Sequence, residues 1–335
     1  MDNLLCLECG FTNEYEFRQT TRKYEGDGYS FTLEVKVPFC KKCGNPIEVE
    51  EIEEEIAERA NGKIRECKGI IKKEEIISIL SRYNVSQKFL SRLLGWGEIT
   101  LTRYISGGYT PNAANSEKIK ALNDPYVFQQ LLDEKIEKAG EEFESENLVN
   151  KLQDNINRNI GEIEKRSGKV YKVVNWFLGQ STDENPVTHL ALQKLLYFSQ
   201  CWNKIWNHAW LFDDDCEAWV HGAVYRNVYN NFKKFKYKPL PKVKRNEEFT
   251  EAETTVLQFV KEYYFDIYTA KSLEMICHLE EPYQSAREGY EKDASCGEVI
   301  NKNVIEAYYT RIAEKYDISK ETPAHVKKYL NDLLA

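Results

Sequence analysis

The chain has few features of an exported or membrane-bound protein. Its first residues carry no basic region followed by an apolar run, so we expect no signal peptide. No stretch approaches the roughly 18 consecutive apolar residues that a membrane-spanning helix needs. These features predict a cytoplasmic protein that does not enter a membrane.

Histidine is scarce and confined to the second half of the chain. The first of the 5 histidines is His189, so we expect no metallohydrolase centre in the first half. Neither a His-Glu-x-x-His spacing nor a nucleophile elbow occurs in the sequence. We therefore expect no enzymatic activity.

Positive charge is in deficit as well. The chain has 46 Lys and Arg against 54 Asp and Glu, which gives a net charge of −8. This balance argues against a generic nucleic-acid coat, and any DNA binding must come from a local basic patch. At 335 residues, 42% of them hydrophobic, the chain is long enough for two or three folded domains.

Cysteine is present in an odd number and is unevenly placed. Four of the 9 cysteines form two Cys-x-x-Cys pairs, each followed by glycine: Cys6, Cys9, Cys40 and Cys43. Two such turns supply the four sulfurs of a closed tetrahedral shell, which suits Zn²⁺. Redox dithiols are the alternative, but no thioredoxin-like βαβ pattern surrounds the pairs. The spacing predicts one structural zinc ion per chain, in a reducing compartment.

The segments around these cysteines predict a small β part that resembles a zinc ribbon. Residues 29–37 alternate between apolar and polar after a Gly-Asp-Gly turn, which is typical of the return strand of a hairpin. The glutamate-rich segment 48–58 predicts a solvated connecting helix. We place a zinc-binding domain at residues 1–62.

Residues 63–124 are predicted to form a helix-turn-helix DNA-binding domain. Two helical patterns flank a Gly-Trp-Gly break, and basic residues outnumber acidic ones here. The second helix is expected to enter the major groove from about Glu98, as part of a dimer on a palindromic operator. The candidate DNA contacts are Thr100, Thr102 and Arg103 for bases and Lys88 for phosphate. A small helical domain that binds only protein is the alternative.

The run LLGWGEITLTRYISGGYTP, residues 93–111, resembles the helix-turn-helix of the MqsA-type antitoxins and of the wider Cro/repressor-like group. The double Cys-x-x-Cys arrangement is similar to the MqsA type as well, so the resemblance covers about residues 1–124. Ile99 stands where those proteins often carry an asparagine that reads a base. Readout at that base is therefore expected to be lost or changed.

The remaining chain divides into a polar, helix-prone segment at 125–168 and an aromatic half at 169–335. We expect the first to be a helical linker, or a segment through which the chain dimerises. Five of the 6 tryptophans fall between Trp176 and Trp219, which predicts a mainly helical domain with its own core and minor β structure. The expected fold class is therefore multidomain and mainly α.

Several short blocks in the aromatic half, at 192–200, 212–222, 224–232 and 277–287, resemble the Panacea domain of SocA-like or GepA-like antitoxins. Ala223 departs from the family pattern, which usually has proline there. The resemblance implies direct binding and neutralisation of a cognate toxin, and in some relatives delivery of a toxin to a protease.

Residues 226–245 carry a charge of +8 with interleaved aromatic side chains. They form either a solvated helix end and loop or a docking face for an acidic toxin, with contact to RNA or DNA as a further alternative. The candidate toxin contacts in the C-terminal half are Lys194, Tyr197, Trp219, Tyr225, Tyr229, Lys233, Lys234, Lys236 and His278. Lys194 itself is expected to snorkel or to pair with a carboxylate.

These observations predict an antitoxin that neutralises a toxin and represses its own operon. The rival interpretation is a phage or plasmid transcription regulator, or a proteolytic adaptor. The two resemblances disagree on the toxin-binding end, because MqsA-type proteins use the zinc-bearing part. We favour the C-terminal half for its aromatic density and its basic stretch.

Overall fold

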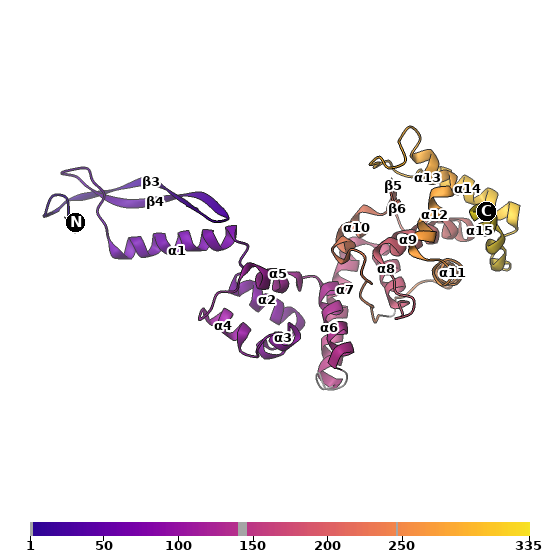
Figure 1. Ribbon diagram of the computed structural model, residues 1–335, viewed down its shortest axis with the longest axis horizontal. Helices are drawn as coiled ribbons and strands as arrows, with labels where there is room; N and C mark the ends of the chain where they lie inside the picture. The colour runs from indigo at the N-terminus through magenta and orange to yellow at the C-terminus, as the bar shows by residue number, and fades with distance from the viewer. Residues whose placement is uncertain (1–2, 140–145, 246) are drawn as a thin grey trace. The chain divides into compact units, whose positions relative to one another are not determined.

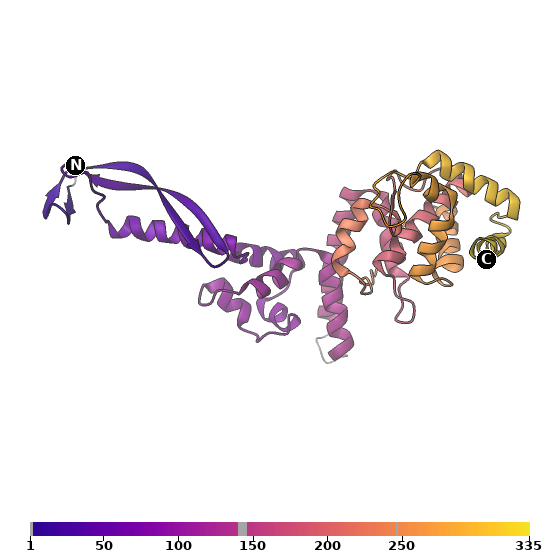
Figure 2. The ribbon, with the colours of Figure 1, turned by 45° about the horizontal axis from the view of Figure 1, so that its top comes forward.

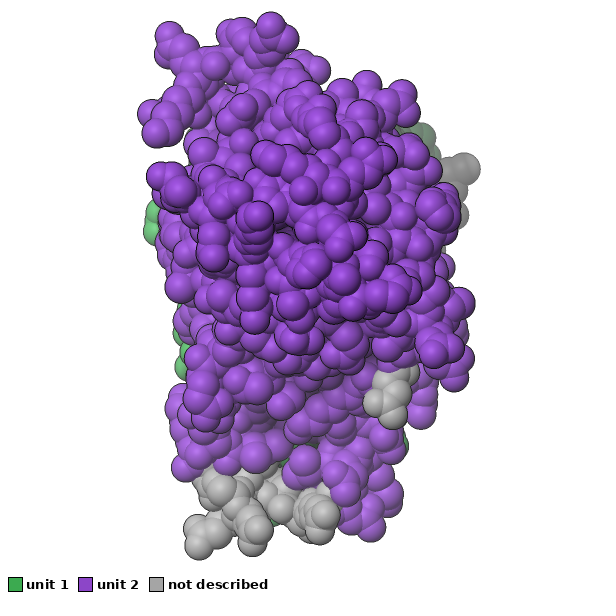
Figure 3. All heavy atoms as spheres, turned by 90° about the vertical axis from the view of Figure 1, so that its right-hand side faces the viewer, with its two compact units in different colours: residues 1–123 green, residues 124–335 purple. Residues whose placement is uncertain are grey.

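The computed structural model describes residues 3–139, 146–245 and 247–335. The chain divides into two compact units, unit 1 (Met1–Asn123) and unit 2 (Asp124–Ala335), which Figure 3 colours separately. Helices predominate, with a few antiparallel hairpins, which confirms the expected mainly α chain with minor β structure (Figure 1). Among the described residues, no helix is both long and apolar enough to cross a membrane.

Unit 1 begins with two antiparallel hairpins. β1 (Leu4–Cys6) pairs with β2 (Phe11–Asn13), and β3 (Tyr15–Gly26) pairs with β4 (Tyr29–Cys40) along its full length. Gly28, in the turn between the long strands, has a φ of 80° that favours glycine. The return strand thus begins at Tyr29, as the alternating pattern predicted.

α1 (Glu50–Cys67) packs on the long hairpin. The buried side chains between them are Leu33, Val35, Val37, Ile56 and Ala60. Arg22 of β3 donates two hydrogen bonds to the Glu53 carboxylate, at 2.6 and 2.7 Å. The acidic segment is therefore a helix with one buried face, and not only a solvated connection.

Short helices complete unit 1: α2 (Lys73–Tyr83), α3 (Gln87–Leu93), α4 (Thr100–Ser106) and α5 (Ala113–Ala121). The Ser86 and Asn112 side chains cap α3 and α5, and α4 ends at Gly107 with a φ of 81°. On α2, Ile76 and Ile79 are buried, whereas Ile77 is 45% exposed.

α9 (His189–Asn207) is the central helix of unit 2 (Figure 2). Every side chain from Ala191 to Asn203 is buried, so this part of the helix is enclosed on all sides. The other elements of unit 2 are α6 (Pro125–Ala139), α7 (Glu146–Ser167), α8 (Lys169–Gly179), β5 (Glu217–Trp219), β6 (Gly222–Val224), α10 (Arg226–Phe232), η2 (Lys233–Phe235), α11 (Glu251–Val260), η3 (Lys261–Phe265), α12 (Ala270–Leu279), α13 (Glu281–Ala286), α14 (Lys302–Tyr316), η4 (Pro323–His325) and α15 (Val326–Leu334).

The described residues of 125–168, the segment expected to be a linker, form α6 and α7 within unit 2. Tyr126 is fully buried, and its hydroxyl donates to Asn175 of α8 at 2.8 Å. Gln129 and Gln153 exchange amide hydrogen bonds of 3.1 and 2.5 Å. Because these contacts tie α6 to α7 and α8, a fragment of the C-terminal half should begin at Asp124.

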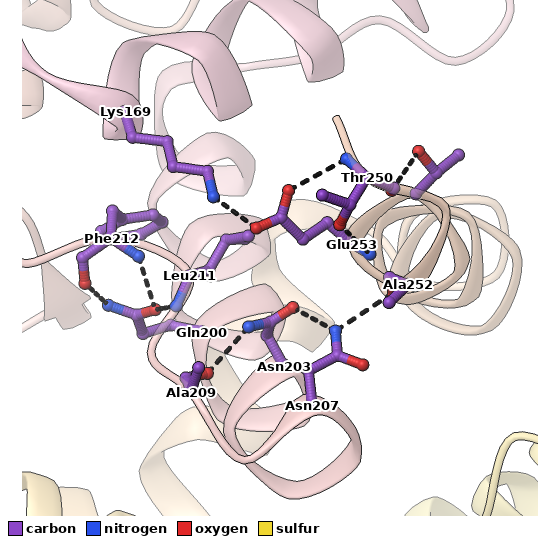
Figure 4. Close-up of polar contacts among 11 residues, drawn as sticks. Lys169, Gln200, Asn203, Asn207, Ala209, Leu211, Phe212, Thr250, Ala252 and Glu253 are labelled. Atoms are coloured by element: carbon purple, nitrogen blue, oxygen red, sulfur yellow. Dashed lines mark hydrogen bonds and ion pairs between the residues drawn. The ribbon is translucent and has the colours of Figure 1, made fainter. Parts of the chain in front are cut away.

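Polar side chains near the end of α9 hold the turn that follows it (Figure 4). The Gln200 amide accepts from the backbone N–H of Leu211 and donates to the carbonyl of Phe212, both at 2.6 Å. Asn203 donates to another carbonyl of the same turn, and Asn207 to a carbonyl at the start of α11. The buried amides of Gln200 and Asn203 thus satisfy backbone groups of the turn after α9.

Candidate functional sites

The four predicted cysteines lie together at the ends of the hairpins of unit 1. Their sulfur atoms all lie within 4.8 Å of one another. The sulfurs of Cys6 and Cys43 are 3.6 Å apart, and those of Cys9 and Cys40 are 4.0 Å apart. This cluster can hold a metal ion.

Two equivalent turns position these sulfurs. The backbone N–H of Gly10 donates to the Cys6 carbonyl at 2.9 Å, and that of Gly44 donates to the Cys40 carbonyl at 2.8 Å. Both glycines adopt left-handed φ values, 70° and 76°. A side chain at either position would strain the turn, which is the physical reason for a glycine after each pair.

The thiols influence one another's ionisation. Backbone N–H groups, chiefly that of Cys43, lower the pKa of Cys40 to about 7. The neighbouring Cys43 thiol, together with burial, raises the pKa of Cys9 to about 12. Four thiolates therefore do not form side by side unaided, and a divalent cation would supply the charge that stabilises them. The donor set fits a closed metal site.

In the second half of unit 1, α4 is fixed against α3 by hydrogen bonds. The backbone N–H of Leu101 donates to the buried Ser91 hydroxyl at 3.3 Å. The Thr102 hydroxyl donates to the Gln87 side chain at 2.8 Å. The two helices are therefore held in one relative orientation.

The predicted DNA contacts all lie on these two helices. Thr102 and Arg103 of α4 are exposed, Thr100 is half-buried, and Lys88 of α3 is exposed. Ile99, at the start of α4, is 56% exposed. All four candidate side chains therefore lie at the surface of the two packed helices α3 and α4, or at the edge of that surface.

Glu98 is a residue of this region whose contacts the sequence did not reveal. Its carboxylate lies 2.9 Å from Lys88 Nζ and 3.6 Å from the Arg92 guanidinium. Both basic residues of α3 are therefore paired with one acid from the turn before α4. In the sequence, the only sign of these contacts is that Glu98 follows Lys88 and Arg92, two basic residues spaced four apart.

Three of the candidate toxin contacts are buried within unit 2. Lys194, Tyr197 and Tyr225 are at most 2% exposed. Lys194 Nζ donates to the Ala223 carbonyl at 2.8 Å, a backbone partner where the sequence suggested a carboxylate or solvent. Burial lowers the pKa of Lys194 to about 8. A Cβ at Gly222 would lie 2.7 Å from the side chain of Lys194, so the lysine packs closely against this glycine. Because Lys194, Tyr197 and Tyr225 are all buried, they support the domain from within.

Three further candidates are half-buried or packed on neighbours. The rings of Trp219 and Tyr229 have centroids 4.7 Å apart. His278 stacks on Tyr283 of α13 with centroids 4.6 Å apart. His278 and Tyr283 line a hollow of about 530 Å³ beside α12.

Part of the basic stretch is paired with acids of unit 2. Arg226 pairs with Glu217, and Lys234 pairs with Asp124. Arg245 lies 2.9 Å from Glu247 and 3.4 Å from Glu164. These contacts leave a smaller set of exposed cations than the charge of the sequence indicated.

The exposed cations that remain include Lys233, Lys236 and Lys238, which follow α10 and together with Tyr237 are called the basic tip. Lys242 and Lys244 are exposed farther along the chain. Lys236 has a left-handed φ of 54°, which sharply turns the chain. The next residue, Tyr237, is 98% exposed. The Tyr237 ring lies among exposed lysines and has no structural role inside unit 2.

A family model described as antitoxin SocA-like, Panacea domain, matches residues 192–284. No curated protein matches the chain. The matched Panacea region runs from α9 into α13 and contains every candidate toxin contact. The match supports a role in a toxin–antitoxin system in general and suggests a regulatory role without catalysis.

Glu280, in the Panacea region, is a buried acid that the sequence analysis did not single out. Tyr309 and Tyr329 each donate to its carboxylate at 2.8 Å, and Tyr197 donates at 3.1 Å. Burial raises the pKa of Glu280 to about 7. Since Tyr309 and Tyr329 lie on α14 and α15, beyond the matched residues, this carboxyl group fastens the C-terminal helices to the Panacea region.

Proposed function

We propose that this chain is the antitoxin of a toxin–antitoxin pair. It binds its cognate toxin through unit 2 and represses its own operon through unit 1. The Panacea match over residues 192–284 is the observation that carries this proposal. The absence of any toxic reading frame beside the gene would favour a phage or plasmid regulator, or a proteolytic adaptor, instead.

The basic tip is our proposed centre of the toxin-binding surface. Concentrated positive charge on a chain of net charge −8 attracts an acidic partner locally and speeds its association. Tyr237 supplies an exposed aromatic anchor of the kind that dominates interface energies. Lys234 lies next to the tip in the chain, and Trp219, Tyr229 and His278 remain candidate contacts elsewhere in unit 2. The buried Lys194, Tyr197 and Tyr225 are left out of the contact surface.

Growth rescue by co-expression with the neighbouring gene tests this assignment. The full chain should rescue growth, and a triple Lys-to-Glu variant at Lys233, Lys236 and Lys238 should not. The matched control reverses three other exposed lysines of unit 2: Lys138, Lys151 and Lys328. If both triple variants rescue equally, the tip is not the surface. If residues 1–123 alone rescue growth and residues 124–335 do not, the toxin binds at the cysteine-bearing end.

We propose that α3 and α4 form a helix-turn-helix reader, with α4 in the major groove and a homodimer on a palindromic operator. The fixed orientation of α4 and the exposure of Arg103 support this. Selection from a random DNA library should yield a palindrome. On it, Arg103→Ala should cost about 1–3 kcal/mol at one base pair, whereas Lys88→Ala should weaken all sequences alike. Unchanged footprints for Arg103→Ala would refute this choice of recognition helix.

We also propose that Cys6, Cys9, Cys40 and Cys43 hold one Zn²⁺ per chain. Four sulfur ligands complete a tetrahedral shell, so the ion stabilises the fold and has no open position for catalysis. Elemental analysis of the purified protein should find one zinc per chain. Protein that is folded over residues 3–49 and contains no zinc would refute the assignment.

A further inference from the structure

Glu98 occupies a position between the two helices of the proposed reader. It lies in the turn between α3 and α4, and its carboxylate contacts Lys88 and Arg92 together. These two bases are four residues apart, so they share one face of α3. All three side chains are partly exposed, between 38% and 59%, and DNA phosphates can therefore reach them.

Lys88 and Arg92 are the only basic residues in the α3 sequence QKFLSRL. Each is engaged by the same carboxylate, so one acid offsets the charge that α3 would offer to a phosphate. Phosphate affinity depends on cations that release condensed counterions when they bind. A cation already paired with Glu98 contributes less, because the phosphate must displace the carboxylate or lie beside it.

We propose that Glu98 restrains DNA binding by unit 1, by competing with backbone phosphates for Lys88 and Arg92. This inference rests on the proposed DNA reader and adds a regulating residue to it. The two ion pairs are exposed and individually weak, so phosphate can displace Glu98, at a cost in affinity. The restraint acts on every sequence alike, because all duplexes present the same phosphates.

Glu98→Gln in the full chain removes the charge and keeps the shape of the side chain. Binding to a labelled duplex of mixed sequence is measured by fluorescence anisotropy over a series of salt concentrations. We expect about three- to tenfold tighter binding at low salt, and a dependence of log K on log salt that is steeper by about one. Melting curves should match those of the parent, which excludes a change in folding.

Two comparisons separate this mechanism from a general effect of charge. Glu117→Gln removes the same charge from an exposed position on α5, and we expect little change in binding. Adding Lys88→Gln to Glu98→Gln should remove much of the gain, because the gain acts through Lys88.

The possible results separate a failure of the proposed role of Glu98 from a failure of the proposed DNA reader. If the parent chain binds no duplex at all, the DNA reader itself is wrong. If the parent binds and Glu98→Gln binds no more tightly, or Glu117→Gln gives the same gain, only the role of Glu98 is wrong.

Discussion

The two units are stabilised in different ways. The hairpin part of unit 1 has two small apolar clusters, one between β4 and α1 and one that includes Cys6, Cys40 and Ile47. Unit 2 surrounds α9 with buried side chains, among them Trp202, Tyr197 and the fully buried Lys194. A small core requires help from a metal or a cross-link, whereas a large core does not. Clustered cysteines of unit 1 can hold a metal ion, whereas buried polar side chains of unit 2, such as Lys194 and Glu280, have hydrogen-bond partners within the fold.

The largest effect should come from Cys40→Ser. If metal binding supplies the folding energy of the hairpin part, losing one ligand removes on the order of 10 kcal/mol of binding energy. Hydrogen exchange should then show unprotected amides in β3 and β4, with α9 still protected. Cys67→Ser is the matched control, since Cys67 is exposed and lies outside the cluster. Protected hairpin amides in the Cys40 variant would break the comparison between the units.

Glu280→Ala should have the largest effect of a single polar change in unit 2. Three tyrosine hydroxyls lose their buried acceptor, so the unfolding free energy should fall by about 3 kcal/mol. Urea denaturation followed by tryptophan fluorescence measures this. The control is Glu281→Ala, because Glu281 is exposed and pairs only at the surface with Arg311. Equal midpoints for the two variants would show that the tyrosine cluster does not need its acid.

The same carboxyl group predicts a pH dependence. Burial raises the pKa of Glu280 from its ordinary 4.5 to about 7, so the folded state keeps a proton that the unfolded state releases. Its contribution to stability is full below pH 4.5 and is lost as the pH rises to about 7, by about 1.4 kcal/mol per pH unit. Glu280→Gln should flatten this slope in denaturation curves. Parallel slopes for parent and variant would assign the pH dependence to other groups.

The contrast between unit 1 and unit 2 also explains which features the sequence can predict. The four-cysteine cluster depends on local turns, so two Cys-x-x-Cys pairs are enough to locate all of its members. The capping box formed by Thr250 and Glu253 at the start of α11 depends on a local sequence pattern as well, and both of its hydrogen bonds are present. By contrast, α9 is enclosed on all sides, and residue identity does not tell which of its polar side chains face inward. The sequence alone therefore makes Lys194 a candidate contact residue and gives no signal for the buried Glu280.

Counting charged residues along the sequence is limited in a similar way. The sequence gives the sum over residues 226–245 but not which cations meet acids from distant segments. Arg226, Lys234 and Arg245 are paired with acids, and only the structure separates them from the basic tip. Glu98 is the parallel case in unit 1, since its pairing with α3 depends on the turn between two helices. In both units, only the structure shows which charged side chains are already paired within the fold.

The smallest expected effect concerns Ile99, an apolar side chain that is exposed in unit 1 although large apolar residues of unit 2 are mostly buried. It precedes Arg103 by four residues, so the two share a face of α4. In a major groove, the apolar group within reach of such a side chain is the thymine methyl.

Ile99→Ala should weaken binding to the selected operator by about 1 kcal/mol. Replacing the contacted thymine with uracil should cause the same loss in the parent and no further loss in the variant. Ile77→Ala is the matched control, an exposed isoleucine on α2 for which we expect no change. If every thymine-to-uracil replacement leaves the parent's affinity unchanged, Ile99 does not read a methyl group, and its exposure serves a protein contact instead.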